Sequence, residues 1–253
     1  MNNLVQMKEH VAVVAGAGSG IGAASAVALA ARGVNIAVLD INLGNAENVA
    51  TLIRNNGGAA NAYKVDLTDG SAVAAVVKNV YTSTGRIDIC VNAVGVTGPT
   101  GVPTHLVPMS DFKSTFEVNF FSAISLQSAV TPYMLEAKYG RIVHIASISG
   151  KEGNPNMAPY SSSKAAIIGL VKSSAKELAK DGVTVNAVAP AVVRTPINDN
   201  TAPEVLEYML SKIPMGRMGE PREVGEMVAF IASPDCAFTT GFVFDLSGGR
   251  ATY

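Results

Sequence analysis

The fold is decided by Ala15-Gly16-Ala17-Gly18-Ser19-Gly20-Ile21-Gly22, a glycine-rich stretch between two patterns of different period. The short apolar run Val11–Ala15 precedes it, and apolar residues recur at helical spacing over about residues 20–32. Glycines between a strand and a helix let the backbone turn sharply and approach a ligand, and a helix N-terminus offers unpaired N–H groups to an anion. The stretch therefore predicts a strand–turn–helix unit that binds the pyrophosphate of a dinucleotide.

Short apolar runs alternate with segments of helical period along the rest of the chain. The runs are Val11–Ala15, Val34–Leu39, Ala59–Val65, Ile87–Val91, Arg141–Ala146, Val183–Ala189 and Phe242–Asp245. Helices are predicted near 20–32, 43–56, 69–84, 110–137, 158–180 and 220–232. Runs that are apolar on both faces are typical of parallel strands covered by helices on both sides. The predicted fold is α/β, a doubly wound Rossmann-type sheet of seven parallel strands, with residues 1–253 in a single domain.

Composition excludes several classes of protein. The chain is 48% hydrophobic and 15% charged, and its formal net charge of −1 gives no general attraction to nucleic acid or to an anionic membrane. No apolar run approaches the roughly 18 residues of a membrane-spanning helix, and the N-terminus lacks a signal-peptide pattern, so we expect a cytoplasmic protein. Only Cys90 and Cys236 occur, so no disulfide framework is expected. No metal-ligand spacing is found, and no catalytic metal is expected.

Two irregular stretches follow predicted strands. Residues 94–108 are rich in Pro and Gly, and residues 194–220 contain Pro196, Pro203 and Pro214. Ligands of open α/β sheets bind beyond the carboxyl ends of the strands, so both stretches should border the site. We expect residues 194–220 to form a lid-like insertion, with room for a short helix.

The second predicted strand is followed by Asp40. A carboxylate at that place accepts hydrogen bonds from ribose hydroxyls and repels a 2′-phosphate. Ile41 and Asn42 are uncharged, and no Arg or Lys lies in the glycine turn. The predicted cofactor is therefore NAD and not NADP.

Tyr160 and Lys164 share one face of a predicted helix because they are spaced i and i+4. A free phenol has a pKa of about 10, which is too high for a base near neutrality, and a nearby cation lowers such a pKa by about 1–3. Ser147 follows the preceding strand, where its hydroxyl is placed to bind a substrate oxygen. These residues predict an oxidoreductase in which Tyr160 is the acid/base for hydride transfer to or from a secondary alcohol or ketone.

The order of these motifs resembles the short-chain dehydrogenase/reductase family over about residues 10–250. The turn Gly16-x-x-x-Gly20-x-Gly22 matches the family's T-G-x-x-x-G-x-G, except that Ala15 replaces the threonine, which implies another local tie for the turn. The resemblance implies four catalytic residues, which are Asn119, Ser147, Tyr160 and Lys164. In this assignment Asn119 helps to hold a water, Ser147 orients the carbonyl, and Lys164 lowers the Tyr160 pKa and holds the nicotinamide ribose.

The resemblance also implies further cofactor contacts, although Ala93 and Ala191 depart from the usual Asn and Gly. Together with the turn and the acid, the expected cofactor-binding residues are Gly16, Ser19, Gly20, Ile21, Gly22, Asp40, Asp66, Leu67, Asn92, Ala93, Tyr160, Lys164, Pro190, Val193 and Thr195.

The substrate is less determined by the sequence. The polar stretch after Ser147 and the scarcity of aromatic residues (6%) favour a small polar substrate such as a sugar, a polyol or a keto-deoxy sugar acid. The expected substrate residues are Ser149, Asn154 and Arg194, and Lys151 and Arg250 are further candidates for binding a carboxylate. His144 is expected in the core, and the role of His105 stays open.

Two alternatives remain. The chain also looks like the 3-oxoacyl carrier-protein reductases, although these usually take NADP, and Asp40 argues against that role. A regulatory protein on the same fold would bind NAD without turnover. We expect a homotetramer, because the helices after Ser110 and around Tyr160 have more apolar positions than one buried stripe needs.

Overall fold

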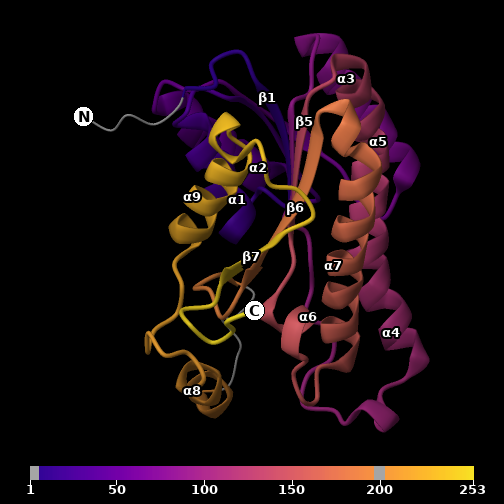
Figure 1. Ribbon diagram of the computed structural model, residues 1–253, viewed down its shortest axis with the longest axis vertical. Coiled ribbons are helices and arrows are strands. Elements are labelled where there is room, and N and C mark those ends of the chain that lie inside the picture. The colour runs from indigo at the N-terminus through magenta and orange to yellow at the C-terminus, as the bar shows by residue number, and fades with distance from the viewer. Residues whose placement is uncertain (1–5, 197–202) are drawn as a thin grey trace.

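In the computed structural model (Figure 1), which describes residues 6–196 and 203–253, seven parallel strands form one sheet. The strand order is β3-β2-β1-β4-β5-β6-β7. The strands are β1 (Val11–Ala15), β2 (Asn35–Asp40), β3 (Ala60–Lys64), β4 (Ile89–Asn92), β5 (Gly140–Ile145), β6 (Val183–Pro190) and β7 (Val243–Leu246). All seven predicted runs are confirmed as strands of this sheet, and the predicted doubly wound, single-domain fold is confirmed.

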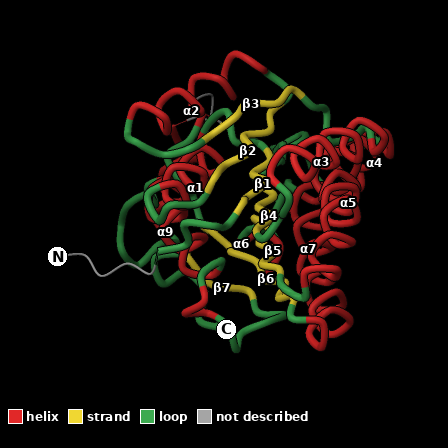
Figure 2. The backbone as a smooth tube through the Cα atoms, turned by 90° about the horizontal axis from the view of Figure 1, so that it is seen from above, coloured by secondary structure: helices red, strands yellow, loops and turns green. Residues whose placement is uncertain are grey.

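Helices cover both faces of the sheet, as the view from above shows (Figure 2). One face carries α1 (Gly20–Ala30), α2 (Leu43–Asn55) and α9 (Pro221–Ile231). The other carries α3 (Gly70–Thr84), α5 (Ser122–Ala137) and α7 (Ala158–Leu178). The remaining α-helices among the described residues are α4 (Met109–Phe116), α6 (Ile148–Glu152) and α8 (Pro203–Ser211).

The two layers form because successive side chains of a strand point to opposite faces. In β1, Ala12 and Val14 pack in the core beneath α1, α2 and α9, whereas Val11, Val13 and Ala15 pack beneath α3, α5 and α7. All five are buried, and removing one Val side chain from water stabilises a fold by about 1.5–3 kcal/mol. An apolar run on both faces is thus the direct consequence of two helical layers.

The strand order reverses between β1 and β4, since β1 pairs with β2 on one side and with β4 on the other. At such a switch point the connections leave in opposite directions and open a crevice at the carboxyl ends of the strands. The glycine turn after β1 and the irregular stretch after β4 therefore meet at this crevice.

Two segments differ from the prediction. The helix expected over 110–137 is α4 and α5 joined by a π-helical turn, Glu117–Phe121, which apolar periodicity does not reveal. The polar stretch after Ser147, for which no helix was predicted, begins with the short helix α6. The Ser147 hydroxyl caps α6 by accepting the N–H of Ser149 at 3.1 Å, and Gly153, with φ of 74°, ends it.

The predicted lid-like insertion, 194–220, is only partly within the described residues, because 197–202 lie outside them. Its described part contains α8, and it starts and ends close together, where Val193 forms a β-bridge with Gly219. Whether it closes over a ligand stays a prediction. No helix among the described residues is both long enough and apolar enough to cross a membrane.

Candidate active site

The glycine turn is held by close backbone contacts. Gly16 and Gly20 have φ of 69° and 54°, which favour glycine. A Cβ at Gly22 would lie 2.1 Å from the carbonyl oxygen of Gly16, so no side chain fits there. The tie expected in place of the missing threonine is present at Gly18, whose N–H donates to Oδ2 of Asp40 at 2.8 Å.

The turn opens onto a cavity of about 550 Å³ at the switch point. The N-terminal end of α1 forms part of the cavity wall. Its N-cap residue, Ser19, makes no side-chain capping bond, so the first N–H groups of the helix are left for a ligand. Of the predicted cofactor residues, Gly16, Ser19, Gly20, Ile21, Gly22, Asp40, Asp66, Leu67, Ala93 and Thr195 line the cavity. A side-chain-free turn, a helix N-terminus and carboxylates farther along fit the pyrophosphate and ribose of a dinucleotide.

Asp40 has two roles in this geometry. Its Oδ2 atom accepts the N–H of Gly18, and its Oδ1 atom accepts the N–H of Asn42 at 2.9 Å. Its side chain still lines the cavity at the end of β2. The carboxylate therefore anchors the glycine turn and also lies on the cavity wall at the end of β2.

The remaining predicted cofactor residues lie behind or beside the cavity. Asn92 is buried, and its Oδ1 atom accepts the N–H of Val94 at 3.2 Å, so it shapes the loop after β4. Pro190 ends β6 and Val193 forms the bridge to Gly219, but neither is part of the cavity lining. Thr195 lines it and packs against Gly20, where a Cβ would approach its Cγ2 atom to 3.3 Å.

Asn119 lies fully buried in the π-helical turn. Its Oδ1 atom accepts the N–H of Val96 at 2.8 Å, and its Nδ2 atom donates to the Val96 carbonyl at 3.0 Å and to Oγ of Ser163 at 2.9 Å. Both amide hydrogens are therefore used within the protein. Asn119 joins the loop after β4 to α7, and only its acceptor oxygen has capacity left for a water.

Ser147 lies between the end of β5 and the start of α6, and Tyr160 lies in the first turn of α7. Ser147 is buried, with 7% of its surface exposed, and Tyr160 is partly exposed. Burial raises the pKa of Tyr160 above its usual 10.0, and a hydrogen bond with Ser147 lowers it. Burial raises the pKa because it disfavours the charged phenolate, and it is the larger of the two effects.

Lys164 is buried on the same helix, and its Nζ atom lies 5.9 Å from the centre of the Tyr160 ring. Nζ donates to the carbonyl oxygen of Ile145 at 2.9 Å, and burial lowers the pKa of Lys164 to about 8. Burial and the hydrogen bond with Ser147 are the causes that shift the Tyr160 pKa here, so the expectation that Lys164 lowers it stays a prediction.

Gly95 was not among the predicted site residues, yet it links the two halves of the site. It lines the cavity, and a Cβ there would lie 3.2 Å from Nζ of Lys164 and 3.3 Å from Oδ1 of Asn119. The cofactor cavity therefore reaches the catalytic candidates through the space that this glycine leaves open. Its place after β4 was a usable signal, since a glycine beyond a strand end often permits close approach.

The predicted substrate residues are partly brought together. Ser149 lies two positions after Ser147 in the sequence. Its Oγ atom accepts a hydrogen bond from Nδ2 of Asn154 at 2.6 Å. Arg194 lies apart from them, 68% exposed, in an ion pair with Glu220 at 3.1 Å.

The other two candidate cations are engaged inside the chain. Lys151 pairs with Asp245 at 3.0 Å, and Arg250 pairs with Glu152 at 3.0 Å, with only 7% and 6% of these cationic side chains exposed. Lys151 also donates to the carbonyl oxygen of Tyr253. The hypothesis that Lys151 or Arg250 binds a substrate carboxylate is therefore not favoured, and Arg194 is the accessible cation of the three.

The histidines and cysteines of the described residues are not part of the cavity lining. His144 is fully buried beside Gln127, its Nε2 atom 3.0 Å from Oε1, and burial lowers its pKa to about 4. His105 is exposed in the turn Thr104–Leu106, and Cys90 and Cys236 are buried and free. Within residues 6–196 and 203–253, no three His, Cys, Asp or Glu side chains are grouped so that they could hold a metal ion.

Comparisons with known proteins agree with this geometry. A family model described as enoyl-(acyl carrier protein) reductase matches residues 16–251. The chain is 42% identical, over 96% of its length and 95% of the relative, to the 2-dehydro-3-deoxy-L-rhamnonate dehydrogenase (NAD(+)) of Sphingomonas sp. (strain SKA58). It is 34% identical, over 97% of its length and 99% of the relative, to the 3-oxoacyl-[acyl-carrier-protein] reductase of Thermotoga maritima.

A solved structure of 7α-hydroxysteroid dehydrogenase in complex with NADH and 7-oxo glycochenodeoxycholic acid superimposes with a TM-score of 0.91 at 33% identity, covering 96% of this chain and 95% of the other. The chain therefore belongs to the short-chain dehydrogenase/reductase family. The predicted enzyme class, an NAD-dependent dehydrogenase that transfers a hydride to or from a secondary alcohol or ketone, is confirmed at this level.

Proposed function

We propose that this protein transfers a hydride between NAD and a small hydroxylated substrate of the sugar-acid class, within carbohydrate metabolism. The observation that carries the proposal is the hydrogen-bonded polar pair Ser149 and Asn154 close to Ser147, which makes the surroundings of the proposed reacting carbon polar. The 42% identity to a rhamnonate-type dehydrogenase over nearly the whole chain supports the same substrate class.

The roles proposed for the catalytic residues follow from their positions. NAD, when bound, accepts or supplies the hydride. Tyr160 exchanges the proton of the substrate oxygen, and Ser147, in hydrogen-bond contact with Tyr160, orients that oxygen. Lys164, buried next to Gly95 and the cavity, holds the ribose, and Asn119 fixes the loop after β4 against α7.

A second candidate is the reduction of a 3-oxoacyl thioester on a carrier protein. It is favoured by the matching family model and by the Thermotoga maritima relative. The carboxylate of Asp40 in the cavity argues against it where such enzymes use NADP, because a 2′-phosphate beside Asp40 would face a negative charge.

The two candidates are separated by steady-state kinetics. The value of kcat/KM is measured for the oxidation of 2-dehydro-3-deoxy-L-rhamnonate, of a neutral sugar and of an aliphatic secondary alcohol, and for the reduction of a 3-oxoacyl thioester. The proposal expects the sugar acid to be best by at least about tenfold. A thioester or an aliphatic alcohol that is better by that factor contradicts it and favours the second candidate or another alcohol.

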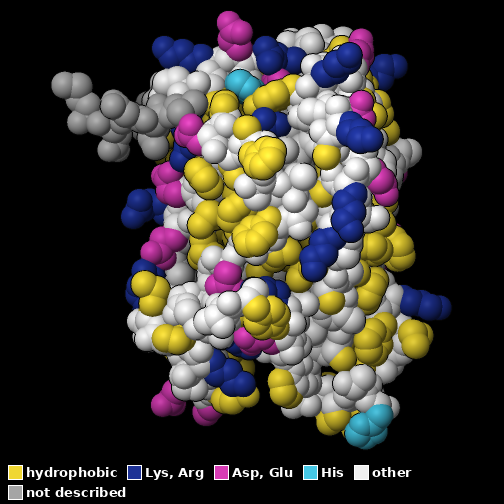
Figure 3. Space-filling model, viewed as in Figure 1, with side chains coloured by type: hydrophobic (Ala, Val, Ile, Leu, Met, Phe, Trp, Pro, Cys, Tyr) yellow, Lys and Arg dark blue, Asp and Glu magenta, His cyan; other side chains and the backbone are white. Residues whose placement is uncertain are grey.

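We further propose a homotetramer in the cytoplasm. The helical surface around α5 and α7 keeps apolar side chains at the surface, including Phe121 (48% exposed) and Leu135 (37% exposed). A second apolar region includes Phe238 and Phe242, which are 107% and 54% exposed, and hydrophobic side chains gather on the face that Figure 3 shows. Two such surfaces on one chain support an assembly with two kinds of contact, and two free cysteines suit a reducing compartment.

A further inference from the structure

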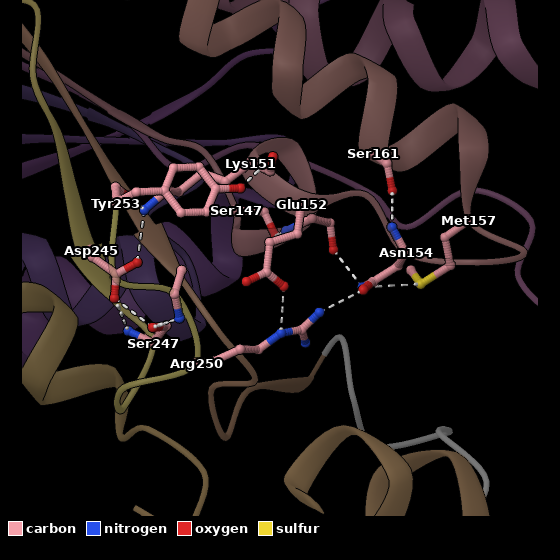
Figure 4. Close-up of polar contacts among 12 residues, drawn as sticks. Ser147, Lys151, Glu152, Asn154, Met157, Ser161, Asp245, Ser247, Arg250 and Tyr253 are labelled. Atoms are coloured by element: carbon pink, nitrogen blue, oxygen red, sulfur yellow. Dashed lines mark hydrogen bonds and ion pairs between the residues drawn. The ribbon is translucent and has the colours of Figure 1, made fainter. Parts of the chain in front are cut away.

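Asn154 and Arg250 are 96 residues apart in the sequence, and a hydrogen bond joins them beside the end of α6 (Figure 4). The Nε atom of Arg250 donates to Oε2 of Glu152 at 3.0 Å, and its Nη2 atom donates to Oδ1 of Asn154 at 2.8 Å. Only 6% of the Arg250 side chain is exposed. The segment after β7 therefore places a buried, anchored cation against one side of the Asn154 amide.

This contact fixes which way the amide faces. A guanidinium group only donates hydrogen bonds, so the Asn154 oxygen must face Arg250 and the Nδ2 atom must face the other way. There Nδ2 donates to Oγ of Ser149 at 2.6 Å, while the backbone N–H of Asn154 donates to Oγ of Ser161 at 3.1 Å. If the side-chain amide of Asn154 were rotated by half a turn, its Nδ2 group would face the N–H groups of Arg250, and two donors would meet without an acceptor.

The direction of the amide decides what the Ser149 hydroxyl can do. Its oxygen already accepts a hydrogen bond from Asn154, and its backbone N–H donates to Oγ of Ser147 at 3.1 Å. Ser149 is only 4% exposed, and its hydroxyl proton has no acceptor among residues 6–196 and 203–253. A buried donor without an acceptor is unfavourable, so a ligand that brings an acceptor gains from this site.

We propose that the Ser149 hydroxyl donates a hydrogen bond to a substrate oxygen beside the reacting carbon, and that Asn154 and Arg250 are positioning residues that fix its direction. This inference rests on the proposed function, since it requires a substrate with an oxygen near its carbinol or ketone, as a sugar acid has. Asn154 then acts through Ser149 and does not touch the substrate, which differs from its predicted role.

The test is a double-mutant cycle with Asn154→Asp and Ser149→Ala. Aspartate has the shape of asparagine and keeps the contact with Arg250, but it only accepts, so Ser149 donates to it and no longer to the substrate. Each variant should lower kcat/KM for the sugar acid by about 5- to 50-fold, the size of one directed hydrogen bond. The double variant should lose no more than the more impaired single variant, because both remove the same bond.

Two controls separate this role from a structural one. Ser161→Ala removes a bond to the Asn154 backbone without changing the direction of its amide, so kcat/KM should stay within about twofold of the wild type. NADH affinity, measured by fluorescence titration, should be unchanged in all variants. If the losses in Asn154→Asp and Ser149→Ala multiply in the double variant, or if Asn154→Asp keeps wild-type kcat/KM, the inference is overturned.

A second readout covers the case in which Asn154→Asp does not fold. Ser149→Ala alone should lose kcat/KM for the sugar acid and keep it for a simple secondary alcohol without a neighbouring oxygen, whereas an equal loss on both overturns the inference. Failure of the proposed function is read separately in the wild type, from its preferred substrate. The double-mutant cycle is then repeated with that substrate. Coupling between Asn154→Asp and Ser149→Ala supports the Ser149 assignment, and independent effects of the two changes overturn it.

Discussion

The Nζ atom of Lys164 donates a 2.9 Å hydrogen bond to the carbonyl oxygen of Ile145, which brings a buried ammonium from α7 to the carboxyl end of β5. No carboxylate is among the causes that shift its pKa; burial alone lowers that pKa to about 8. The protein thus keeps an uncompensated cation at the point where β5, α7 and the cofactor cavity meet, and such a group has a measurable effect on stability.

The cost of this buried charge should appear in the pH dependence of folding. Below pH 8 Lys164 is charged in both the folded and unfolded states, and above about pH 10.5 it is neutral in both. Between these values the unfolded chain binds more protons, so stability rises with pH. Without cofactor, the free energy of unfolding of the wild type should rise relative to Lys164→Met, by up to about 3 kcal/mol across this window. Urea unfolding of both proteins at several pH values measures it, and parallel curves contradict the buried charge.

Tyr160→Phe should abolish turnover while the protein still binds NAD. The ring remains to pack, but the exchangeable proton is lost, and positioned proton transfer is worth about 10²- to 10⁴-fold in rate. Tyr139→Phe is the matched control, because that tyrosine has a buried hydroxyl without a hydrogen-bond partner among the described residues and lies at the opposite end of β5. A Tyr160→Phe enzyme with more than about a tenth of the wild-type kcat would show that another group is the acid/base.

Asp40 should determine the choice of cofactor, and its two hydrogen bonds suggest a refined test. Asp40→Asn removes the charge but keeps an acceptor for the N–H of Gly18, whereas Asp40→Ala removes both. Asp40→Asn should raise the efficiency with NADP relative to NAD by about tenfold or more, since like-charge contacts cost several kcal/mol. Asp40→Ala should also weaken NAD, because the glycine turn loses its anchor. Equal kcat/KM with NAD and NADP in the wild type would contradict this assignment.

The proposed tetramer predicts a particle of four times 26.1 kDa in light scattering at micromolar concentration. Phe121→Asp should reduce that mass, because it places a charge on the exposed apolar surface next to α5. Leu52→Asp changes a side chain of similar exposure (50%) on α2 and should leave the mass unchanged. A wild-type mass near that of one chain contradicts the assembly.

Several features of the fold and the site could be read from the sequence because they depend on local pattern. Val11–Ala15 is apolar on both faces since helices cover both sides of the sheet, and the glycine turn follows it since a pyrophosphate site needs backbone without side chains. Tyr160 and Lys164 share a face because four residues make about one helical turn. Asp40 lines the cavity because it stands at the carboxyl end of β2.

Other features were decided by contacts between distant segments. The sequence by itself determined the doubly wound fold and which residue types stand at the strand ends, because these follow from periodicity and turn chemistry. Only the tertiary structure showed that Arg250 donates a hydrogen bond to Asn154, that Gly95 lies between Lys164 and Asn119, and that Lys151 is paired with Asp245. A pattern along the chain indicates which side chains face a layer. The partner of a buried charge or amide depends instead on how distant segments pack. Arg250 and Asn154 are 96 positions apart in the sequence, and no local spacing encodes their contact.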